Sequence, residues 1–164
     1  MSTHPGRVIA AAILALLPAA VLPAATLEGR WKLVEQRHGS GRANLVAVEP
    51  PVKLEFYLVE SRLAGRIWVE GNQAKALPWP SFSSEHGPLP VEIRQLVIGA
   101  GSDVARARYR VSLSESDGEI LEVTEEYRLA EKGRALVGTV TVASPADGPS
   151  RGSYVLQRRF EREP

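Results

Sequence analysis

Apolar and polar residues alternate with a period of two over most of the chain that follows residue 30. The alternation runs through the segments 31–34, 52–59, 63–70, 105–113, 121–129, 136–142 and 154–161. Successive side chains of a β-strand point to opposite faces, so this pattern indicates strands of an antiparallel sheet with one buried face. No helical period competes with it over any long stretch. The chain is therefore predicted to be all-β.

The connections between these segments are typical of hairpins. Ser116-Asp117-Gly118 and Glu131-Lys132-Gly133 each end in a glycine that can take a positive φ, and Ser61 lies at another tight reversal. The segment 77–90 holds four prolines and no alternation, which predicts a loop or an edge crossing, because proline cannot donate to a strand ladder. With a further strand at 91–98, we expect an antiparallel up-and-down meander β-barrel of about eight strands.

The first 25 residues have the layout of a signal peptide. A short polar start with one fixed charge, at Arg7, precedes the apolar run 8–17, which ends at Pro18 and a series of alanines. That run has about ten residues, whereas a membrane-spanning helix needs about 20. We expect a signal peptide over 1–25, a mature domain over 26–164, and export to the periplasm or the medium. The alternative is an uncleaved anchor over 8–27.

The composition excludes several classes of function. The chain has no cysteine, so it forms no disulfide, thiolate metal site, cysteine nucleophile or lipid-modified cysteine. Twenty basic and nineteen acidic residues are interleaved, which gives no electrostatic case for nucleic acid as a partner. His38 and His86 are isolated from other metal-ligating residues. We therefore expect no metal, no cofactor and no catalytic set, and oligomeric state is left open.

The strongest motif opens the first predicted strand. Gly29-Arg30-Trp31 begins that strand, and Arg158 lies on the apolar face of the last one. Together with the meander order, these residues resemble the lipocalin-like domains of the calycin superfamily, in the form of a small bacterial exported β-barrel. The resemblance implies that Trp31 plugs one barrel end beneath a basic residue of the last strand. Strand parity selects Arg158 over Arg159 for that cation–π contact. A helix after the eighth strand and a Thr-Asp-Tyr motif, both usual in lipocalins, are absent.

A closed barrel directs one face of every strand at a common axis. Seven residues share this parity and are predicted to line a ligand cavity reachable near the segment 77–90: Phe56, Ile67, Tyr109, Val123, Glu125, Tyr127 and Val140. An interior carboxylate is costly unless it is paired, so Glu125 is either a polar anchor for a ligand or a partner in an internal ion pair. Trp79 and Phe82 either cover a cavity mouth or tuck their segment onto the barrel.

These features favour an exported protein that binds a small hydrophobic molecule. The alternative is a non-enzymatic structural or interaction protein of the cell envelope, with a filled barrel. An enzyme that uses Glu125 as an interior acid has less support, because no catalytic partner is identifiable. Glu35 and Arg37 line the cavity mouth if the first strand runs straight, whereas a bend in that strand would end its parity, so that their direction would no longer follow from Trp31 and Leu33. An outer-membrane barrel is excluded, since 6% aromatic residues are too few for two girdles.

Overall fold

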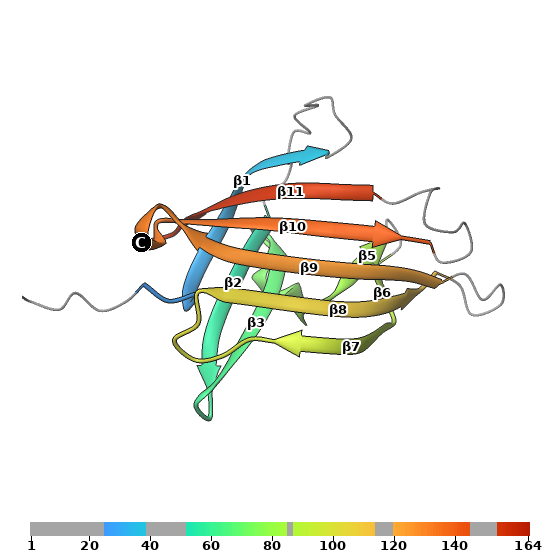
Figure 1. Ribbon diagram of the computed structural model, residues 1–164, viewed down its shortest axis with the longest axis horizontal. Coiled ribbons are helices and arrows are strands. Elements are labelled where there is room, and N and C mark those ends of the chain that lie inside the picture. The colour runs from blue at the N-terminus through green and yellow to red at the C-terminus, as the bar shows by residue number, and fades with distance from the viewer. Residues whose placement is uncertain (1–24, 39–51, 85–86, 114–119, 145–153) are drawn as a thin grey trace, which may run out of the picture.

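The computed structural model describes residues 25–38, 52–84, 87–113, 120–144 and 154–164 (Figure 1). Its elements are the strands β1 (Gly29–His38), β2 (Val52–Val59), β3 (Arg62–Val69), β4 (Leu77–Trp79), β5 (Phe82–Ser84), β6 (Gly87–Leu89), β7 (Val91–Val97), β8 (Val104–Ser112), β9 (Ile120–Ala130), β10 (Ala135–Ala143) and β11 (Tyr154–Arg162), with the helical turns η1 (Gln73–Lys75) and η2 (Glu131–Gly133). None of the described helices is long and apolar enough to cross a membrane. The expected signal peptide lies outside the described residues, apart from Ala25.

Nine strands form one antiparallel sheet in the order β4-β3-β2-β1-β11-β10-β9-β8-β7. Every neighbouring pair except β1 and β11 is also consecutive in the sequence, so two meanders meet at that one pair. In Figure 1, β1 to β3 cross behind the run of β8 to β11, and the sheet curls into a half-barrel. The all-β antiparallel meander is confirmed. The expected closed barrel of about eight strands is not: within the described ranges the sheet has two ends, β4 and β7.

Strands β8 and β9 show why the alternating sequence folds this way. In β8 the residues Ala105, Ala107, Tyr109 and Val111 are buried, and the arginines between them face outward. The outward arginines pair with glutamates of β9: Arg106 with Glu126, and Arg108 and Arg110 with Glu122. Burial of the apolar face drives the strands together, and the cross-strand ion pairs suit the exposed face.

The proline-rich segment was predicted as a loop or an edge crossing, and its first strand, β4, does lie at an edge of the sheet. It contains the three short strands β4, β5 and β6, of which β4 pairs with β3 and β5 pairs with β6. The pairing of Gly65 with Trp79 carries the indole of Trp79 into the interior, where the residue is 5% exposed. This segment therefore tucks into the core at Trp79, one of the two arrangements considered for it.

The first strand bends. Its register against β11 shifts between Leu33 and Glu35, which is a β-bulge or a similar irregularity. Beyond the shift, Gln36 reaches an interior arginine, while Glu35 and Arg37 form an ion pair with each other and border an outer groove. The parity of the first strand is therefore lost after Leu33, which is the second of the two arrangements considered for Glu35 and Arg37.

Trp31 is fully buried, as predicted, but its cationic partner is Arg162 and not Arg158. The guanidinium carbon of Arg162 lies 4.3 Å from the centroid of the indole. The register pairs Trp31 with Arg162, whereas Arg158 lies opposite Gln36. Arg158 and Arg162 have the same strand parity, so alternation alone could not separate them. The predicted stack of Arg158 on Trp31 was wrong because the last strand continues to Arg162.

Arg162 also ties the chain together around Trp31. Its Nε donates to the carbonyl oxygen of Gly133 at 3.0 Å, Nη1 to that of Glu28 at 2.6 Å and Nη2 to that of Thr26 at 2.7 Å. Gly29 has a φ of 128°, and a Cβ there would lie 2.6 Å from Nη1 of Arg162. The positive φ favours glycine at this position, and a side chain there would also displace the guanidinium of Arg162.

Candidate ligand-binding site

An open cavity of about 530 Å³ lies on the concave side of the sheet, between β2–β3 and β10–β11. Its apolar walls are formed by Val52, Ile67, Trp68, Val69, Leu77, Phe82, Val140, Val142, Tyr154 and Leu156. The polar residues that border it are Lys75, Ser81, Ser83, Glu125 and Arg158. A space of this size with apolar walls and a few polar groups has the usual properties of a small-molecule site.

The seven residues predicted for the cavity divide into two groups. Ile67, Glu125 and Val140 border the open space. The other four, Phe56, Tyr109, Val123 and Tyr127, are at most 1% exposed and belong to the packed core beside it. Parity thus identified the interior face, but it did not separate the cavity wall from the filled part of the interior.

A chain of aromatic rings fills the interior next to the cavity. Phe56 and Trp79 are in edge-to-face contact with centroids 5.5 Å apart, Trp79 and Tyr127 are 5.9 Å apart, and Tyr127 and Phe160 are 5.8 Å apart. Such pairs stabilise a core beyond the area they bury. The half-barrel is therefore filled toward the Trp31 end and open toward the end of β10 at which Val142 lies.

Glu125 is the buried carboxylate of this interior, with 4% of the residue exposed. Its Oε2 accepts a hydrogen bond from Nε1 of Trp79 at 2.8 Å, and its Oε1 accepts one from the hydroxyl of Tyr109. The carboxylate therefore has a donor on each oxygen, from β4 and from β8. Trp79 was not predicted as a partner, because its proline-rich surroundings hid the strand that delivers it.

Arg158 is the cationic counterpart, and it is half-buried. Its Nε donates to Oε1 of Gln36 at 3.0 Å, and its Nη1 donates to the hydroxyl oxygen of Tyr127 at 3.2 Å. Along β10, Arg158 is paired with Gly138 and Glu125 with Val140, so Arg158 lies two residues nearer the Trp31 end. The predicted inward direction of Arg158 is correct, although its role at Trp31 was not.

The two tyrosines beside Glu125 and Arg158, which are Tyr109 and Tyr127, remain protonated. Burial, followed by the nearby Glu125 carboxylate, raises the pKa of both Tyr109 and Tyr127 far above the usual 10.0. Burial alone would lower the pKa of Arg158, but Tyr127 and Glu125 raise it above its usual value. The site thus holds one guanidinium and hydroxyl donors that keep their protons at any physiological pH.

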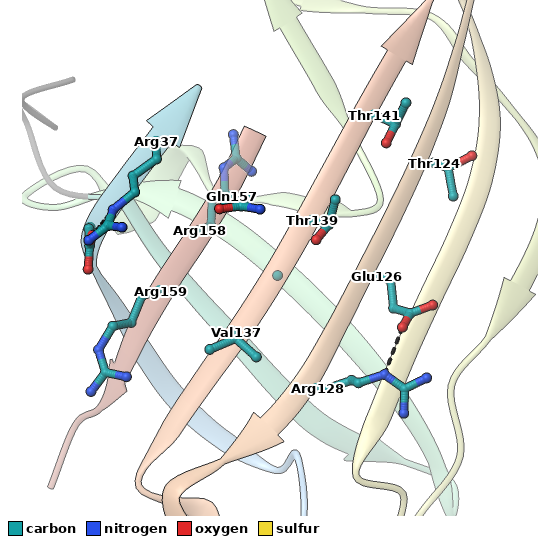
Figure 2. A pocket seen from close by; sticks show the side chains of 12 residues that line it. Arg37, Thr124, Glu126, Arg128, Val137, Thr139, Thr141, Gln157, Arg158 and Arg159 are labelled. Carbon is teal, nitrogen blue, oxygen red and sulfur yellow. Dashed lines mark hydrogen bonds and ion pairs between the residues drawn. The ribbon is translucent and has the colours of Figure 1, made fainter. Parts of the chain in front are cut away.

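A second space lies on the convex face and has a different character. Figure 2 shows this open groove of about 660 Å³ over β9, β10 and β11, with Thr124, Thr139 and Thr141 among its lining residues. Three of its cations are engaged by neighbouring carboxylates: Arg128 by Glu126, Arg159 by Glu131 and Arg37 by Glu35. The fourth, Arg158, borders both spaces and is hydrogen-bonded to Gln36 and Tyr127. Because most of its lining residues are polar and three of its arginines are in ion pairs, the groove suits a solvated surface.

Comparison with known proteins finds similarity among solved structures. No family model matches the chain, and no curated protein matches it. Among solved structures, it is similar to a zebrafish ileal bile acid-binding protein, determined in complex with cholic acid. The match has a TM-score of 0.43 and 12% sequence identity, and it covers 83% of this chain and 98% of that one.

Proposed function

We propose that this protein binds a small amphipathic molecule in the cavity between β2–β3 and β10–β11. The observation that carries the proposal is the cavity itself: about 530 Å³, with apolar walls and with Glu125 and Arg158 at its inner side. Apolar walls supply affinity by removing ligand surface from water, and placed polar groups fix the ligand's orientation. The seven predicted site residues remain our proposed binding region, and three of them, Ile67, Glu125 and Val140, border the space that the ligand would occupy.

We further propose that the protein belongs with the lipocalin-like domains of the calycin superfamily and works outside the cytoplasm, in the periplasm or the medium. The Gly29-Arg30-Trp31 motif and the buried, arginine-capped Trp31 support the first statement. The short apolar run 8–17 supports the second. Amino-terminal sequencing of exported protein should find a start between residues 24 and 27. Recovery of intact 8–17 in membrane-extracted protein would contradict the cleavage.

The binding function is tested by titrating the protein with an uncharged, environment-sensitive dye such as N-phenyl-1-naphthylamine. We expect saturable fluorescence enhancement with a Kd of tens of micromolar or tighter, about −6 kcal/mol or better. Val142→Trp places a large ring at the cavity wall and should weaken dye binding by about tenfold or more. Val137→Trp, on the outward face of the same strand, is the matched control and should leave binding unchanged.

If no probe binds at these concentrations, the alternative function replaces binding: a structural or interaction protein of the cell envelope with a filled barrel. The rings that fill the interior at Phe56, Trp79, Tyr127 and Phe160 are what favour that alternative. Native mass spectrometry of freshly purified protein provides a second readout, because a co-purified lipid adds a discrete mass that Val142→Trp should remove.

A further inference from the structure

The inner side of the cavity, formed by Glu125 and Arg158, offers a ligand hydrogen-bond donors, because its carboxylate is already engaged. Both carboxylate oxygens of Glu125 already accept hydrogen bonds, from Trp79 and from Tyr109. Arg158 uses Nε and Nη1 for Gln36 and Tyr127, and among the described residues its Nη2 has no hydrogen-bond partner. Since Arg158 borders the cavity, the two N–H groups of Nη2 and the second N–H of Nη1 are the donors left for a ligand.

The charges of this inner side already balance. Glu125 contributes one negative charge and Arg158 one positive charge, and Tyr127 lies between them, bonded to Arg158 and close enough to Glu125 to feel its charge. The remaining cation of the lining, Lys75, is exposed and ends the short turn η1 at the cavity rim, where water screens it.

A ligand carboxylate would disturb this balance. It would bring a second anion next to Glu125, and both would share one guanidinium in a poorly solvated space. Burying a charge without its own partner costs several kcal/mol, and two neighbouring carboxylates disfavour each other's ionised form. An uncharged acceptor, such as the carbonyl oxygen of a ketone, an ester or an amide, takes the Nη2 hydrogen bond without that cost.

We propose, on the basis of the binding function above, that the ligand's polar end is an uncharged carbonyl-type acceptor held by Arg158, and that Glu125 excludes carboxylates. Glu125 is here a specificity-determining residue that acts through charge and does not itself bond to the ligand. The cavity therefore selects neutral amphiphiles over fatty-acid-like anions, although its walls suit the hydrocarbon chains of both.

The test is displacement of the neutral dye by two matched compounds, decanoate and the methyl ketone in which a methyl group replaces the acid hydroxyl. At pH 7.5 the acid is ionised and the two chains are otherwise alike. For the unmodified protein, the ketone should displace the dye at about tenfold lower concentration than the acid, a difference of about 1.4 kcal/mol. Decane, which lacks an acceptor, should compete less well than the ketone.

Glu125→Gln supplies the decisive variant. It leaves the guanidinium of Arg158 without its counter-charge, so the preference should shift toward decanoate by about tenfold or more. Glu126→Gln, the neighbouring residue on the outward face, removes the same charge from the protein and should leave the ratio unchanged. Circular dichroism and thermal unfolding of both variants establish that they are folded.

The outcomes separate this inference from the function on which it rests. If no dye or ligand binds the unmodified protein, the binding function itself is wrong. If ligands bind but either decanoate or decane displaces the dye as well as the ketone does, the binding function is supported and the selection of a neutral acceptor is wrong. If the ketone is preferred but Glu125→Gln leaves the ratio unchanged, Glu125 does not exclude anions and the charge argument fails.

Discussion

Arg162→Ala should destabilise the fold by about 2 kcal/mol. The variant removes the cation over the Trp31 ring, which contributes about 0.5–1 kcal/mol where the guanidinium is largely exposed. It also removes the part-buried hydrogen bond to the Gly133 carbonyl, about 1 kcal/mol, and two exposed bonds to the carbonyls of Glu28 and Thr26, which water largely replaces. These four contacts join the start of β1, the η2 turn and the end of β11.

Urea unfolding followed by tryptophan fluorescence measures the effect. With a denaturant slope of about 1–3 kcal/mol per molar, the loss corresponds to a midpoint lowered by about 1 M. Arg159→Ala is the control, because Arg159 faces outward in an exposed ion pair with Glu131, and such pairs contribute little to stability. Equal midpoints for the two variants would refute the assignment of Arg162 as the cation that closes this end.

Three further outcomes are expected from the same unfolding assay. Gly138→Ala should cost about 1–3 kcal/mol, because a Cβ there would lie 2.3 Å from Cδ1 of Tyr127; Gly99→Ala, whose Cβ meets nothing within 4 Å, should cost far less. Trp79→Phe should cost about 1–3 kcal/mol, because it removes the indole donor of a buried carboxylate; unchanged stability would mean that this hydrogen bond contributes nothing. Hydrogen bonds from Arg128 and Arg106 lower the pKa of Glu126 below its usual 4.5. The stabilisation that the ionised Glu126 contributes is therefore present above about pH 4.5 and is lost as the pH falls through its pKa in the folded protein. A urea midpoint that stays constant down to about pH 3 would contradict this.

The strands were predictable because each buries one face, and burial of alternate residues leaves a period of two in the sequence. The strands of the proline-rich segment were not predictable, since strands of three residues are too short to show a period and proline favours the prediction of a loop or an edge crossing. The most important residue missed in this way is Trp79. Its place in the core depends on a pairing with Gly65, where the absence of a side chain makes room for the ring of Phe56 and the Cβ of Trp79.

Register was the second limit. Parity places Arg158 inside and Arg159 outside, as observed, but it treats Arg158 and Arg162 alike. Only the alignment of β1 against β11 decides which of them meets Trp31, and that alignment is a contact between the two ends of the domain. The same limit applies to the cavity. Parity names the residues that face inward, whereas the division into wall and filled core depends on where the large rings pack.

The pairing of β1 with β11 has a consequence for how the chain reaches this structure. It is the single link between the β4-to-β1 and β11-to-β7 halves of the described sheet, and it joins the first strand of the sequence to the last. Contacts between distant residues form slowly, because the loop between them must close before the contact stabilises anything. At synthesis rates of about 5–20 residues per second, the edge of β1 that does not face β2 has no partner until β11 has been made. The sheet is therefore completed only after β11 is available, and until then the β1–β4 meander exposes the apolar face that the finished half-barrel buries.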